Sequence, residues 1–104
     1  MTTTKLQALN SALVARSVTL NQYLLMRLLY DAQASGKTGM SPTALRDHLD
    51  ITGAGTTGAI DKLETLGFVL RSAVPRDRRK FSVGLTGYGA EAVRAIVVCV
   101  DAVE

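Results

Sequence analysis

The sequence predicts a mainly α-helical domain with one small β-hairpin, of the winged helix-turn-helix class. Two short amphipathic segments, residues 42–49 and 53–66, are joined by the tight connection Asp50-Ile51, as is typical of a helix-turn-helix. Two short apolar segments on either side of a basic turn follow, which indicates a β-hairpin before a last apolar helix. The length of 104 residues suits a single domain over residues 1–104.

The first two predicted helices supply much of the expected core. The first covers roughly residues 5–16. Its thin apolar stripe consists of Leu6, Leu9 and Leu13. Thr19 is an expected N-cap of the second helix, and Gln22 three positions later completes a capping box. This helix extends to about Ala34 and is apolar around much of its circumference, so we expect it at the centre of the domain.

Capping residues also delimit the later elements. Ser41 and Pro42 open the third helix, and Thr52 caps the fourth, which ends before the C-cap glycine Gly67. Residues 68–72 and 81–85 are the predicted strands, and the polar residues 75–79 form the turn between them. Thr86 then caps a last helix over residues 87–103.

Positive charge is concentrated in one segment. The chain has a net charge of +3, and residues 71–80 alone contain five Lys or Arg against Asp77. Such a local basic cluster favours contact with phosphates over a merely solvated loop. A single cysteine, Cys99, fits a reducing compartment, and no secretory leader or membrane span is visible, so we expect a cytoplasmic protein.

Catalytic and metal-binding patterns are not visible in the sequence. His48 has no second His or Cys nearby, and the glycine-rich residues 53–58 lack the Gly-Lys-Ser/Thr ending of a phosphate loop. We therefore expect no enzyme, no cofactor and no metal site. Cys99 lies in an apolar run, which predicts a buried structural thiol rather than a redox sensor.

Several stretches resemble the MarR family of bacterial winged-helix regulators, in unbroken order over residues 19–94. They are Thr19-Leu20-Asn21-Gln22, Ser41-Pro42-Thr43-Ala44-Leu45, residues 60–69, Asp77-Arg78-Arg79 and Leu85-Thr86-Gly87-Tyr88-Gly89. The resemblance implies a homodimeric transcriptional regulator that binds double-stranded DNA, with residues 1–18 and 87–104 at the dimer contact. Helix 53–66 would enter the major groove, and the wing, residues 71–85, would lie on phosphates and the minor groove. Many members of the family release DNA on binding a small anionic or phenolic ligand or on oxidation of a cysteine, but the sequence identifies no such effector.

The expected DNA contacts follow from residue chemistry and from this resemblance. Arginines on a protruding hairpin suit a narrow minor groove, and hydroxyls or a methyl group on the fourth helix suit base edges. The third helix offers its N-terminus to a phosphate, although Ser41 as an ordinary N-cap explains that residue equally well. Lys62 either contacts a phosphate or only solvates the outer face of the fourth helix. The predicted contacts are Ser41, Thr43, Ala54, Thr56, Thr57, Lys62, Arg71, Arg76, Arg78, Arg79 and Lys80. The resemblance implies that Asp77 orients a wing arginine.

One alternative function stays open at this point. Three glycines in residues 53–58, and Gly58 where the family usually has Arg, leave the fourth helix short of long side chains. Such a winged helix could instead be a protein-interaction module, an adaptor or antagonist of another regulator. The basic wing favours DNA binding, and the lack of long side chains on the fourth helix favours the interaction module.

Overall fold

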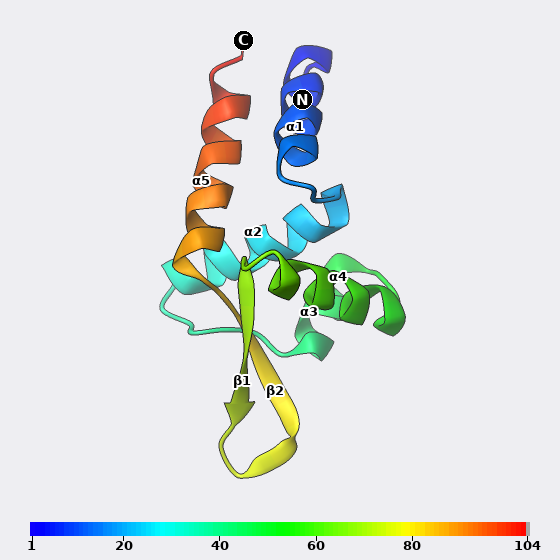
Figure 1. Cartoon of the computed structure of the whole chain (residues 1–104), viewed down its shortest axis with the longest axis vertical. Coiled ribbons are helices and arrows are strands. Elements are labelled where there is room, and N and C mark those ends of the chain that lie inside the picture. Colours follow the sequence, from blue (N-terminus) through cyan, green and yellow to red (C-terminus); the bar gives the residue numbers. More distant parts are fainter. Residues whose placement is uncertain (104) are drawn as a thin grey trace.

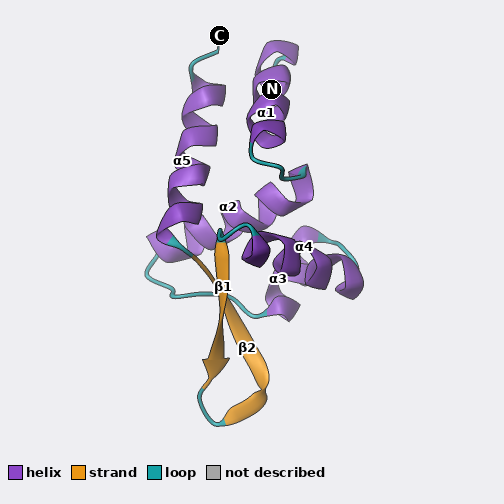
Figure 2. Ribbon diagram, in the orientation of Figure 1, coloured by secondary structure: helices purple, strands orange, loops and turns teal. Residues whose placement is uncertain are grey.

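The computed structural model describes residues 1–103 and has the predicted winged helix-turn-helix fold (Figures 1 and 2). Its elements are α1 (Thr3–Ala15), α2 (Leu20–Ala34), α3 (Pro42–Leu49), α4 (Gly53–Thr65), β1 (Val69–Val74), β2 (Asp77–Leu85) and α5 (Gly87–Asp101). Helices α1 and α5 lie side by side at one end of the 49 Å long axis, and the hairpin projects at the other end (Figure 1). The hairpin, hereafter the wing, therefore protrudes from the body of the molecule at the end opposite α1 and α5.

The helices begin at the predicted hydroxyl caps. The Gln22 amide N–H donates to the Thr19 hydroxyl at 3.2 Å, and the Thr19 N–H donates to the Gln22 side chain at 2.9 Å, which completes the capping box. The Thr52 hydroxyl accepts from the Gly55 N–H at 2.9 Å at the start of α4. Because each cap satisfies a backbone donor that the helix leaves free, these residues fix where α2 and α4 begin.

The core forms where α2 crosses the other helices. The side chains of Leu25, Met26 and Leu29 in α2 are completely buried. Completely buried residues from the other elements are Leu45, Ile60, Leu63, Val83, Val93 and Ile96. However, Leu20 and Leu24 are 52% and 39% exposed, so part of the apolar surface of α2 lies outside the core.

The wing is anchored at its base by contacts that the sequence does not reveal. Met40, in the α2–α3 connection, pairs with Val83 of β2 through two backbone hydrogen bonds of 2.9 and 2.8 Å. The side chain of Gln33 accepts from the Leu85 N–H at 3.1 Å. The Thr86 hydroxyl donates to the Gly67 carbonyl at 2.7 Å, which ties the start of α5 to the end of α4. The base of the wing is thus fixed to α2 and to the α2–α3 connection, and the residues that flank the wing are bonded to each other.

The wing differs from its predicted bounds at the tip. The strands continue past residues 72 and 81, so that only Pro75 and Arg76 connect Val74 to Asp77. The polar composition of residues 75–79 predicted a turn, but here residues 77–79 belong to β2. The base of the hairpin is buried through Val69, Val83 and Leu85, but its tip is exposed to water. A strand segment outside the core needs no apolar alternation, so polar residues are compatible with it.

The α1–α5 end exposes several apolar side chains. Leu6, Val14 and Val98 are 52%, 68% and 66% exposed. Cys99 is also exposed, so the prediction of a buried thiol is wrong for this chain alone. The apolar run from Ala95 to Val100 exceeds one helical turn, so it covers both the inward face and the outward face of α5. Over the described part of the chain, no helix is long and apolar enough to cross a membrane.

Candidate nucleic-acid interface

Helix α4 presents a face of small side chains to solvent. Ala54 and Thr57 are exposed, as predicted for groups that contact base edges. Thr56 is only 2% exposed, and its hydroxyl donates to the Thr52 carbonyl at 3.0 Å. The prediction that Thr56 contacts DNA is therefore wrong. Its side chain faces the interior of the domain, whereas that of the next residue, Thr57, faces solvent.

Two glycines leave space on the same helix. A Cβ atom added at Gly53 or Gly58 would meet no described atom within 4 Å. Glycine in a helix costs up to about 1 kcal/mol relative to alanine. No packing within the described chain requires glycine at these positions, so the bare surface of α4 is free for a partner to approach.

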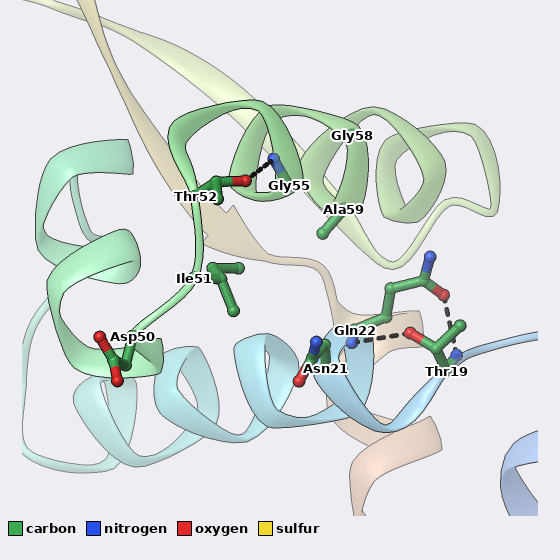
Figure 3. A pocket seen from close by; sticks show the side chains of 9 residues that line it. All are labelled: Thr19, Asn21, Gln22, Asp50, Ile51, Thr52, Gly55, Gly58 and Ala59. Atoms are coloured by element: carbon green, nitrogen blue, oxygen red, sulfur yellow. Dashed lines mark hydrogen bonds between the residues drawn. The ribbon is translucent and has the colours of Figure 1, made fainter.

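An open hollow lies beside this surface, between α4 and the N-terminal end of α2 (Figure 3). Its volume is about 570 Å³, and Figure 3 shows Gly55 and Gly58 on its α4 side, with Ile51 and Gln22 between the helices. The remaining lining residues are Thr19, Asn21, Asp50, Thr52 and Ala59. The sequence did not predict this hollow, although the glycine spacing indicates a helix face without side chains.

The wing tip holds a cation on a strained backbone. Arg76 has a φ of 69°, in the left-handed region where glycine is favoured. Pro75 before it supplies the fixed φ that suits the first central position of such a turn. An arginine at the glycine position of a tight turn costs conformational energy, which points to a role for its charge.

The basic residues of the wing lie in a bulge. Ala73 pairs with Phe81 and Val74 pairs with Asp77, so β2 has residues 78–80 as an insertion opposite one step of β1. Arg78, Arg79 and Lys80 are all exposed. Bulges turn side chains away from the regular strand direction, and here three consecutive cations lie within the bulge.

Asp77 supports this bulge through the backbone. Its carboxylate accepts from the Arg79 N–H at 3.0 Å and lies 3.9 Å from the Lys80 ammonium. The resemblance implied that Asp77 orients an arginine side chain. In the structure it instead fixes the main chain from which Arg79 extends.

The N-terminus of α3 faces the wing bulge across a groove of about 420 Å³. Ser41, the N-cap of α3, and Thr43 of α3 line one side, and Arg79 and Lys80 of β2 line the other. The Ser41 hydroxyl accepts from the Ala44 N–H at 3.1 Å, so it is an N-cap as well as a wall of the groove. The apolar lining residues, which the sequence did not single out, are Pro42, Val74 and Phe81. Four predicted contacts are thus brought together by the fold.

Arg71 and Lys62 do not line this groove. Lys62 is exposed on α4, next to Asp61. Arg71 of β1 donates to the Asp61 carboxylate, lies 3.9 Å from the Glu64 carboxylate, and stacks over the Phe81 ring with 4.9 Å from guanidinium carbon to ring centroid. Because these groups already hold the guanidinium, the structure does not support Arg71 as a direct DNA contact.

Comparisons with known proteins place this arrangement in a family. A model of the MarR family matches residues 18–81, which include α2, the helix-turn-helix and most of the wing. The chain belongs to the MarR family. The match ends at Phe81, so it contains the whole bulge and the groove beside α3.

Relatives of this MarR-family chain include a Bacillus subtilis (strain 168) protein, the HTH-type transcriptional repressor YetL. It is 35% identical over 74 residues, which are 71% of this chain and 42% of the relative. The chain therefore spans less than half the length of this relative.

Solved structures of the same fold include S. aureus MepR in a complex with DNA, with a TM-score of 0.83 and 24% identity over 92% of this chain and 75% of that one. A mutant of S. aureus MepR bound to an oligodeoxyribonucleotide gives a TM-score of 0.84 and 23% identity, over 94% of this chain and 69% of that one. At these identities the likeness establishes the fold of this chain.

Within residues 1–103, no group of three or more His, Cys, Asp and Glu side chains is placed to hold a metal ion. In the groove beside α3, the polar groups that converge are hydroxyls and cations, which are suited to phosphate oxygens.

Proposed function

We propose that this chain binds double-stranded DNA as part of a transcriptional regulator. Helix α4 enters the major groove, and the wing contacts phosphates and the minor groove. The observation that supports this most directly is the groove in which Ser41 and Thr43 face Arg79 and Lys80. A helix N-terminus and two cations around one concave surface favour an anionic backbone, and the proposal assigns no catalytic role.

Salt-dependent binding to mixed DNA tests this proposal. We expect the affinity to fall steeply as salt rises, because cations bound to phosphates displace condensed counterions. If the protein is retained on DNA independently of salt, or is not retained at all, the result would contradict the proposal and favour the interaction module.

The geometry of the tip predicts opposite effects of one substitution on stability and on binding. Arg76→Gly relaxes the left-handed backbone, so the free energy of unfolding should stay equal or rise by up to about 1 kcal/mol. DNA binding should weaken, and the salt slope should fall by about one unit for the lost phosphate contact. Denaturant unfolding and salt titrations measure the two effects. Arg76→Lys is the control, since it keeps the charge, and unchanged DNA binding by Arg76→Gly would exclude a contact at the tip.

The bare face of α4 limits the chemistry available to base edges. With Thr56 turned inward, Ala54 and Thr57 offer methyl groups, and Thr57 adds one hydroxyl. Methyl groups make apolar contacts with the thymine methyl in the major groove. We therefore propose that α4 favours thymine at the positions beneath it.

Uracil in place of thymine removes only that methyl group, so it tests this preference. We expect a loss of about fourfold for each contacted thymine, the value of one buried methyl group. Competition binding with duplexes that contain a single uracil measures the loss. In Thr57→Ala, the loss on uracil substitution should be smaller at one thymine position. Equal affinity for every uracil duplex would contradict methyl recognition.

We further propose that the chain forms a homodimer through α1 and α5. Exposed Leu6, Val14 and Val98 lie on these two helices, and a two-fold partner would cover them. Sedimentation should therefore show a dimer at micromolar concentration, and Val98→Glu should shift it toward monomer. A monomeric parent protein at that concentration would contradict the dimer. Thr65→Glu is a control, because it adds the same charge at an exposed position of α4.

A further inference from the structure

The groove between α3 and the wing has an apolar part that phosphate binding alone does not require. Its apolar lining residues, hereafter the apolar patch, are Pro42, Val74 and Phe81. Each of them is half-buried, so part of each side chain remains accessible. Phosphate oxygens are bound by hydroxyls, amides and cations, which the groove already supplies. The groove therefore suits a ligand that has an apolar part next to an anionic one.

The polar and apolar lining residues lie directly beside each other. Lys80 precedes Phe81 in β2, and Thr43 follows Pro42 in α3. The side chain of Lys80 is 73% exposed, so its ammonium group is accessible from the groove. The Arg71 guanidinium lies over the Phe81 ring at 4.9 Å from the centroid, so the rest of the ring is available to a ligand.

The place of the groove in the fold indicates which part of DNA reaches it. In the proposed binding mode α4 lies in the major groove of DNA and the wing reaches the adjacent minor groove. The DNA strand that separates these two grooves must therefore cross the surface between α3 and the wing. The protein groove lies at this surface, because α3 lines one side and β2 lines the other. A nucleotide of that strand presents a phosphate and, next to it, a deoxyribose.

We propose that the apolar patch packs against one deoxyribose of this strand while Thr43 and the two cations hold the adjacent phosphate, so that the groove selects deoxyribose over ribose. The inference rests on the proposed function and adds a specificity that phosphate contacts lack. A ribose would place its 2′-hydroxyl, the group that distinguishes RNA from DNA, against Pro42, Val74 and Phe81. Since none of these side chains has a hydrogen-bonding group, the hydroxyl would lose water without gaining a partner.

Duplexes of a selected DNA site that contain a single ribonucleotide test this selectivity. A complete RNA duplex is unsuitable, because its A-form geometry changes both grooves. We expect an affinity loss of about tenfold at one nucleotide beside the wing, the cost of one desolvated hydroxyl. This nucleotide should lie between the base pairs beneath α4 and the A·T-rich flank. Equal affinity for all ribonucleotide positions, or the largest loss elsewhere in the site, would overturn the inference.

A 2′-fluoro nucleotide at the same position separates the hydroxyl group from the shape of the sugar. Fluorine favours the same sugar pucker as the hydroxyl group but has no proton to donate. We expect the fluorinated duplex to bind nearly as well as unmodified DNA, since no hydrogen-bond donor is desolvated. A loss as large as that of the ribonucleotide would assign the effect to sugar pucker and overturn the role of the patch.

Val74→Thr places a hydrogen-bonding group on the patch. Val74 is half-buried at the end of β1, where threonine fits with little change in volume. The hydroxyl of threonine can pair with the 2′-hydroxyl, so the ribonucleotide penalty should fall from about tenfold to about twofold. Ala73→Ser is the matched control, because it adds a hydroxyl at the neighbouring exposed position, which does not line the groove. It should keep the penalty of the parent, and an unchanged penalty in Val74→Thr would overturn the inference.

The readout is the ratio of two affinities of the same protein, for the ribonucleotide duplex and for the DNA duplex. Lost stability or lost charge changes both affinities together and leaves this ratio unchanged. A parent protein that binds DNA with a steep salt dependence but shows no ribonucleotide penalty would overturn the deoxyribose contact and leave the proposed function in place. A parent protein without salt-dependent DNA binding would overturn both.

Discussion

Replacing Arg78 and Arg79 together by alanine should weaken DNA binding roughly 10- to 100-fold at about 0.1 M salt, because two phosphate contacts are lost. Both residues lie in the bulge of β2, and both side chains are exposed. The salt slope should fall by about two units, and all DNA sequences should be affected similarly. Titrations at several salt concentrations, against a selected site and a scrambled site, provide the measurement.

The fold should survive this change. Exposed residues at a hairpin tip contribute little to stability, so the free energy of unfolding should stay within about 0.5 kcal/mol of that of the parent protein. Lys37→Ala, in the exposed α2–α3 connection, is the control for loss of positive charge elsewhere. If the double variant binds as tightly as the parent, the bulge does not contact DNA.

Gly89→Ala should destabilise the fold by about 3 kcal/mol or more, since overpacking against backbone cannot relax easily. A Cβ atom at Gly89 would lie 2.2 Å from the Phe68 carbonyl oxygen and 2.8 Å from the Leu85 side chain. The clash would separate the start of α5 from the start of β1. Chemical denaturation compares the variant with the parent.

Gly58→Ala is the matched control for this prediction. It introduces the same atom on α4, where a Cβ would meet no described atom within 4 Å. It should raise the free energy of unfolding by up to about 1 kcal/mol through helix propensity. Equal stability of the two alanine variants would show that α5 does not pack against the hairpin as described.

The sequence was sufficient for the elements whose signals are local. Thr19 with Gln22, Ser41 with Pro42, and Gly67 predicted helix ends correctly, because capping depends on neighbouring residues. The hairpin was also predicted, but the turn at its tip was predicted to be too long, since the polar residues 77–79 are compatible with either a turn or an exposed strand. The bulge depends on strand register, which composition does not specify.

The candidate site was less predictable because side-chain direction depends on tertiary packing. Thr56 and Thr57 are chemically identical and adjacent, yet only Thr57 faces solvent. Arg71 looked like part of the basic segment, and its partner Asp61 lies ten residues away in the sequence on another element. Cys99 lies in an apolar run that is longer than the buried stripe of α5. Helical phase could have indicated the positions of Thr56 and Cys99, whereas the Arg71 contacts require the fold.

Selection of bound sequences from a random pool of DNA duplexes tests the central claim most directly. A dimer that places one α4 in the major groove of each half-site should enrich a palindrome, with half-sites separated by about one helical turn of 10 base pairs. The account predicts thymines beneath α4 and A·T-rich flanks beneath the wing. Recovery of the pool without enrichment, together with retention that does not depend on salt, would contradict a DNA-binding role for this chain.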